Sequence, residues 1–101
     1  MNFTKESAAY LNSLSSKEIQ IYPNPATGKT FTCSFYSETA TELTLKITDL
    51  SGRTIATQVV SAAVGQNTVP VRINTNATGV HIITLDGTGI KYNTQKVILN
   101  N

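Results

Sequence analysis

The chain contains very little of several residue types on which specialised sites depend. Its 101 residues include one cysteine, one histidine and no tryptophan. A single cysteine, Cys33, cannot form an internal disulfide, and the sequence offers no Cys/His cluster with metal-ligand spacing. A lone histidine leaves no second base for a nucleophilic triad. We therefore expect no catalytic residue, no metal ligand and no cofactor.

Charge is also scarce, and long hydrophobic runs are absent. Charged residues make up 14% of the chain, and eight basic and six acidic side chains are scattered singly. A nucleic-acid interface needs a cluster of basic residues, and a membrane span needs about 20 apolar residues in a row. Since 40% of the residues are hydrophobic, the composition is not that of a disordered chain. We expect one globular domain with no nucleic-acid partner and no membrane span.

The first residues lack the features of a secretory signal. Met1–Glu6 does not lead into an apolar stretch with a small-residue cleavage site. Residues 1–18 are rich in Ser, Asn and Ala, and the spacing of Ala8, Leu11 and Leu14 predicts at most a short helix. We interpret residues 1–18 as a linker or passenger tail and 19–101 as a domain. The chain is then either cytosolic or a C-terminal piece of a longer exported protein.

What the chain does have is a series of short β-like runs. From Ile19 onward, segments rich in Val, Ile, Thr, Phe and Tyr are separated by turn residues at intervals of roughly 8 to 12 residues. Alternation is cleanest where Leu43, Leu45 and Ile47 share one face. The pattern predicts an all-β fold, a seven-stranded immunoglobulin-like antiparallel β-sandwich. The predicted segments are 19–22, 30–36, 42–49, 53–60, 66–73, 79–86 and 89–99.

Several positions within these segments have specific expectations. Cys33 falls on the apolar side of its strand and is predicted to be a small buried residue. Pro70 cannot donate to a strand ladder, which predicts an edge strand. The run 80–85 is apolar on both alternating sets, which predicts a central strand covered on both faces or a bulged one. Its His81 is expected to be a satisfied or surface imidazole, and Asp49–Arg53 a tight hairpin.

Four short motifs carry a resemblance to a known family. They are Ile21-Tyr22-Pro23-Asn24-Pro25, Asp49-Leu50-Ser51-Gly52-Arg53, Gly79-Val80-His81-Ile82-Ile83 and Lys96-Val97-Ile98-Leu99. In order and spacing they resemble the type A C-terminal sorting domain of proteins exported by the type IX (Por) secretion system of Bacteroidetes. The resemblance covers roughly residues 19–99. His81 is a departure, because the family more often carries an aromatic residue there.

The resemblance implies that the domain functions as a sorting signal for secretion. Such a domain is recognised by the type IX outer-membrane translocon and removed by a cell-surface sortase-like cysteine peptidase, so the domain is a substrate and not an enzyme. The protein would be secreted or displayed at the cell surface, after passing the periplasm and outer membrane. We expect cleavage within residues 1–20. The implied recognition residues are Pro23, Asn24, Pro25, Gly52, Gly79, Lys96, Val97, Ile98 and Leu99.

Other interpretations of the same sequence compete with this one. A β-sandwich is also a common accessory module, carbohydrate-binding or adhesive, and Tyr22, Tyr36 and Tyr92 are candidates for rings on an outer face.

The terminal strand is expected to have few tertiary partners, so that it can be exposed or paired in trans. Exposed strand edges also predict that two copies can dimerise by strand addition.

Overall fold

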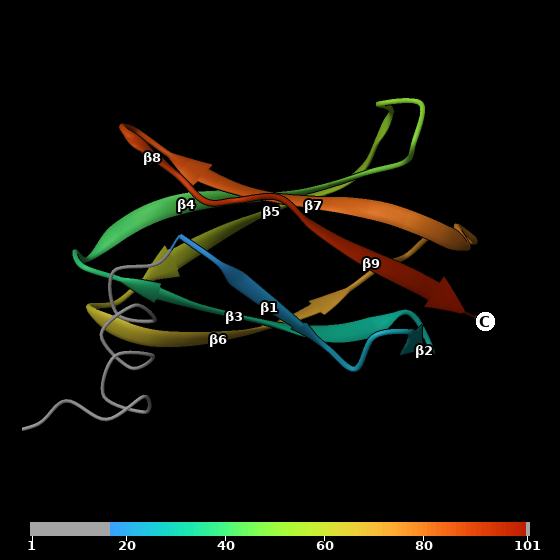
Figure 1. Ribbon diagram of the computed structural model, residues 1–101, viewed down its shortest axis with the longest axis horizontal. Helices are drawn as coiled ribbons and strands as arrows, with labels where there is room; N and C mark the ends of the chain where they lie inside the picture. Colours follow the sequence, from blue (N-terminus) through green and yellow to red (C-terminus); the bar gives the residue numbers. More distant parts are fainter. Residues whose placement is uncertain (1–16, 101) are drawn as a thin grey trace, which may run out of the picture.

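The computed structural model describes residues 17–100, so the predicted linker or tail, and the short helix predicted within it, lie outside the described residues except for positions 17 and 18. All regular structure in the described range is β, and no helix there is long and apolar enough to cross a bilayer. The strands form two facing layers (Figure 1). They are β1 (Ile19–Tyr22), β2 (Ala26–Thr27), β3 (Thr30–Ser37), β4 (Thr41–Thr48), β5 (Thr54–Ala62), β6 (Gly65–Arg72), β7 (Gly79–Gly87), β8 (Ile90–Lys91) and β9 (Gln95–Asn100).

The two layers are a small sheet and a large one. The small sheet has the order β1-β3-β6, and the large one has the order β2-β9-β7-β4-β5 with β8 paired to β7. The predicted all-β sandwich is therefore confirmed. The seven-stranded immunoglobulin-like detail is not confirmed, because the described chain forms nine strands. The fully antiparallel arrangement is wrong in one place, since β2 runs parallel to β9.

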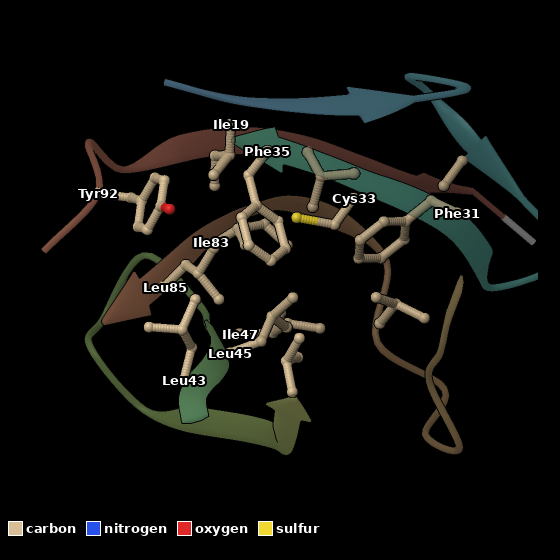
Figure 2. Close-up of a cluster of buried hydrophobic side chains, with 14 of the residues drawn as sticks. Ile19, Phe31, Cys33, Phe35, Leu43, Leu45, Ile47, Ile83, Leu85 and Tyr92 are labelled. Carbon is tan, nitrogen blue, oxygen red and sulfur yellow. The ribbon is translucent and has the colours of Figure 1, made fainter. Parts of the chain in front are cut away.

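The core fills the space between the layers with side chains from both sheets (Figure 2). Leu43, Leu45 and Ile47 point into it with 1% or less of their surface exposed, which confirms the alternation expected for that strand. Cys33 is also buried as predicted, and desolvation raises the pKa of its thiol to about 11. The thiol is therefore protonated at neutral pH.

The expectations about strand position are largely confirmed. Pro70 lies in β6, which pairs only with β3 and so forms an edge of the small sheet. The strand β7 lies between β9 and β4, which is the central place predicted for it. Its inward residues are buried, but the outward Val80 and Ile82 are only half-buried. The outer face of this strand is therefore covered only in part.

The prediction of a single strand over residues 89–99 is wrong. The segment divides into β8 and β9 because Tyr92 turns into the core, where it is 2% exposed. Its backbone amide donates to the Leu85 carbonyl at 3.0 Å, and its hydroxyl donates to the Tyr36 carbonyl. Its ring meets Phe35 edge to face, with centroids 5.4 Å apart. These contacts hold the chain away from the strand path between the two pieces.

The predicted hairpin at Asp49–Arg53 is present and joins β4 to β5. The Asp49 carboxylate accepts hydrogen bonds from the Ser51 hydroxyl at 2.6 Å and from the Arg53 amide at 2.9 Å. These bonds lower the pKa of Asp49 from 3.8 to about 2. Gly52 takes a φ of +92°, a backbone conformation that residues with a side chain rarely adopt.

Candidate functional site

The C-terminal strand β9 lies inside the large sheet and not at its margin. It pairs antiparallel with β7 over Gln95–Leu99 and parallel with β2 at Leu99 and Asn100. Val97 and Leu99 point inward and are completely buried. The expectation that this strand has few tertiary partners is therefore wrong. It is fixed by a sheet partner on each side and by two side chains in the core.

Asn24 connects the Pro23–Pro25 turn to this strand. Its side-chain amide donates to the Lys96 carbonyl at 3.0 Å, and its side-chain oxygen accepts from the Ile98 amide at 3.0 Å. We call this pair of bonds the Asn24 bridge. One carboxamide thus supplies a donor and an acceptor to the edge of β9, as a neighbouring strand would. The pairing of β9 with β2 begins just after it, at Leu99.

Lys96 and Ile98, which alternate with the buried Val97 and Leu99, point away from the core. Lys96 lies opposite Ile82, and Ile98 lies opposite Val80, in the β7–β9 register. Because directly paired residues project to the same side of a sheet, these four side chains form one surface, which we call the β7–β9 outer face. Lys96 is exposed and the three apolar members are half-buried. The surface is an apolar patch with one positive charge.

The remaining predicted site residues are glycines with different positions. Gly79 begins β7 directly opposite Leu99, so it lies beside the end of the terminal strand, and its φ is +91°. Gly52 lies in the β4–β5 hairpin, two strands away from β9 across the sheet. The register pairs Thr48 with Ile82, so this hairpin projects from the same end of the sheet as Gly79 (Figure 1). The structure brings together Pro23–Pro25, Gly79 and Lys96–Leu99, while Gly52 stands apart.

The start of the described chain is held by the segment between β8 and β9 and by the first residue of β9. The Asn93 amide donates to the Lys17 carbonyl at 2.8 Å, and the Gln95 side chain donates to the Ile19 carbonyl at 2.9 Å. The Lys17 ammonium lies 5.6 Å from the centre of the Tyr92 ring. Ile19 itself is 1% exposed. The chain is therefore fixed to the body of the domain from Lys17 onward.

The described residues offer little to a catalytic or metal-based interpretation. Among residues 17–100 no group of three or more His, Cys, Asp or Glu side chains comes together. His81 is buried, and its Nδ1 lies 3.1 Å from the Gly79 carbonyl, which can only accept, so this nitrogen carries the proton. The imidazole is the satisfied one that the sequence predicted.

An open groove of about 440 Å³ lies beside the Pro23–Pro25 turn. Its polar lining consists of Thr27 from β2, Thr30 and Thr32 from β3, and Arg72 from β6. Of the three tyrosines proposed for an outer face, Tyr22 is 45% exposed, whereas Tyr36 is half-buried and Tyr92 belongs to the core. The three rings therefore do not form a common platform.

The sequence analysis missed two parts of this site. It did not identify Val80 and Ile82 as surface partners of Lys96 and Ile98, although the apolar residues on both sides of the 80–85 run were a usable signal. It also did not foresee the Asn24 bridge. A side-chain bond between residues 72 positions apart leaves no local pattern in a sequence.

Comparison with known proteins gives a family match and a weak structural likeness. The family model described as a secretion system C-terminal sorting domain matches residues 20–100. No curated protein sequence matches the chain. Among solved structures, an alkylpurine DNA glycosylase of Pseudomonas fluorescens, AlkC, bound to DNA with an abasic site analog, gives a TM-score of 0.46 at 12% identity. That likeness covers 96% of this chain and 37% of the glycosylase chain.

Proposed function

Because the chain belongs to the secretion system C-terminal sorting domains, the sorting signals of type IX secretion, we propose that the type IX translocon recognises its β7–β9 outer face. Domains of this family are not enzymes, and they direct export through the outer membrane to the cell surface or the medium, which implies contact with the secretion machinery. The finer proposal concerns which residues are read and how the domain is later removed.

The Asn24 bridge is the observation that supports this proposal most directly. It links two motifs from opposite ends of the domain, the Pro23–Pro25 turn and Lys96–Leu99, into one structure. A recognition surface assembled in this way exists only in the folded domain. This supports recognition of the folded domain by the translocon, with the Pro23–Pro25 turn at the border of the β7–β9 outer face.

The alternation along β9 divides its residues into two roles. Val97 and Leu99 are completely buried, so they contribute to folding and are not accessible to a partner. Lys96 and Ile98 face outward and can be contacted. A half-buried apolar patch with a charge beside it is the kind of surface that protein partners cover. Lys96 and Ile98 are therefore the proposed contact residues of the motif.

Removal of the domain by a cell-surface sortase-like cysteine peptidase is the second part of the proposal. A peptidase needs an extended substrate in its cleft, and residues 17–20 are bonded to Asn93, Gln95 and β3. We place the cleaved bond before Lys17. The proposed linker or tail is residues 1–18 and the proposed sorting domain is residues 19–101, with the backbone of Lys17 already bonded to the domain.

The experiment is export of a reporter fused ahead of residue 1 in a type IX-competent host. Lys96→Ala and Ile98→Thr are compared with Lys46→Ala, which removes an exposed lysine from the outward side of β4 in the same sheet. We expect each β9 variant to reduce the exported fraction by about tenfold, a loss of roughly 1.4 kcal/mol in binding, and Lys46→Ala to leave it unchanged.

Two measurements keep the outcome interpretable. Thermal unfolding of each purified variant shows whether the domain is still folded, and mass spectrometry of the released reporter gives the cleaved bond. Unchanged export of both β9 variants would refute recognition through the outer face. A cleaved bond between Lys17 and Gln20 would refute the proposed boundary while leaving recognition untouched.

A further inference from the structure

The lateral edges of the two sheets differ in how they are protected. Edge strands of natural proteins usually carry a proline, a charge, a bulge or a cover that prevents pairing with another chain. In the small sheet, β6 carries Pro70 and Arg72, and β1 is only four residues long and runs into Pro23. In the large sheet, the margin beyond β9 is covered by β2 and the Asn24 bridge. The fourth edge, β5, is different.

The strand β5 is long and uncharged. It has nine residues, pairs only with β4, and contains neither proline nor any charged residue. The only irregularity is a bulge at its start, where the register steps from Ile47–Ala56 to Thr48–Thr54 and leaves Ile55 without an opposite residue. The regular part of the strand is therefore residues 56–62, a seven-residue edge with no protecting feature.

Val59 lies at the centre of this regular part. It is 61% exposed, although it is a β-branched apolar residue in the middle of a strand. The other strongly exposed aliphatic residues, Leu50 and Val64, lie outside the strands. Val59 projects outward, since its neighbours Gln58 and Val60 are the residues that pair with Leu45 and Leu43. An apolar side chain is thus placed at the midpoint of the unprotected edge.

We propose that two copies of this chain associate through their β5 strands, paired antiparallel about a two-fold axis at Val59. In this register Val59 lies opposite its own copy, Thr57 lies opposite Ser61, and Gln58 lies opposite Val60. Each pair joins residues of the same face, because a two-fold axis perpendicular to a sheet keeps the faces of both copies aligned. The two six-stranded sheets then continue into one.

The composition of β5 suits a second copy of itself. Since the strand has no charge, antiparallel self-pairing brings no like charges opposite each other. The outward pairs that result, Val with Val and Thr with Ser, are favourable cross-strand combinations.

The dimer edge also lies at the far side of the sheet from β9, with β4 and β7 between them. Association therefore leaves the β7–β9 outer face free, and it does not depend on the proposed sorting function.

The test combines association with a register-specific cross-link. Sedimentation of the full chain over a micromolar to millimolar series is expected to show a monomer–dimer equilibrium, and Val59→Lys is expected to weaken it by about tenfold or more. Thr68→Lys, on the edge strand β6, is the matched control and should leave the equilibrium unchanged.

The cross-link uses the absence of other accessible thiols in the described residues. Cys33 is buried, so a cysteine introduced on β5 is the reactive one. Val59→Cys is expected to form a disulfide-linked dimer with oxidised glutathione, because the two substituted positions face each other. Ser61→Cys is the control, since in this register its two copies are about 13 Å apart. A chain that is monomeric throughout the series, or equal cross-linking of both variants, would overturn the proposal.

Discussion

Replacing Asn24 by alanine tests whether the Asn24 bridge fixes the terminal strand. The change removes the donor to the Lys96 carbonyl and the acceptor from the Ile98 amide. It leaves β2, β7 and the core contacts of Val97 and Leu99 in place. Any effect therefore reports on two hydrogen bonds, and the variant is expected to fold.

The size of the effect follows from the exposure of these bonds. A hydrogen bond within a protein contributes about 0.5–1.5 kcal/mol net, because water replaces it in the unfolded chain. Both bonds of Asn24 are exposed, so water can reach Lys96 and Ile98 once the side chain is gone. We expect a loss of about 1–2 kcal/mol in the free energy of unfolding. In a domain of this size each kcal/mol lowers the melting temperature by about 4–8 °C.

Two readouts separate a local effect from a global one. Urea unfolding gives the change in stability, and amide hydrogen exchange gives the protection of Ile98. Asn24→Asp keeps an acceptor for the Ile98 amide but loses the donor to the Lys96 carbonyl. Asn76→Ala, in an exposed loop, is the control. If Asn24→Ala changed neither the stability nor the exchange of Ile98, the bridge would have no energetic role and the reasoning would fail.

Four further outcomes follow from the structure. Because the pKa of Asp49 is lowered in the folded domain, its contribution to stability is present above about pH 4 and is lost as the pH falls towards 2. In acid titrations Asp49→Ala should therefore lose less stability than the unchanged domain between pH 4 and pH 2. Tyr92→Phe leaves the Tyr36 carbonyl without its donor and should cost about 1–3 kcal/mol in urea unfolding. Cys33 should react with a thiol reagent at pH 8 only at the rate at which the domain opens, because its pKa is about 11. Gly52→Ala should lower stability by roughly 1 kcal/mol, measured in the same way, since its φ is +92°.

The part of the fold that sequence reasoning predicted is the part encoded by local alternation. The buried set Leu43, Leu45 and Ile47 follows directly from period-two patterning, and the Asp49–Arg53 hairpin follows from the turn chemistry of its residues. The edge position of Pro70 follows from its missing amide hydrogen. In each case the residues that determine the structure are neighbours in the sequence.

The features that were missed depend on partners far along the chain. The two-residue strand β2 is too short to show a period and exists because β9 lies beside it. The break between β8 and β9 falls in a run that is rich in β-forming residues on either side. It is set by the contacts of Tyr92 with Phe35 and Tyr36, more than fifty residues away. Such contacts are visible only once both layers are in place.

The same long-range contacts determine how the terminal motif should be tested. Deleting residues 96–101 removes Lys96 and Ile98 from the outer face, but it also removes Val97 and Leu99 from the core. Burial of these two side chains contributes about 3–6 kcal/mol, a large share of the stability of a domain of this size. It also leaves Asn24 and the edge of β7 without their partner. Loss of export after such a deletion would follow from unfolding alone, so only outward substitutions in a folded domain can show that the machinery reads this strand.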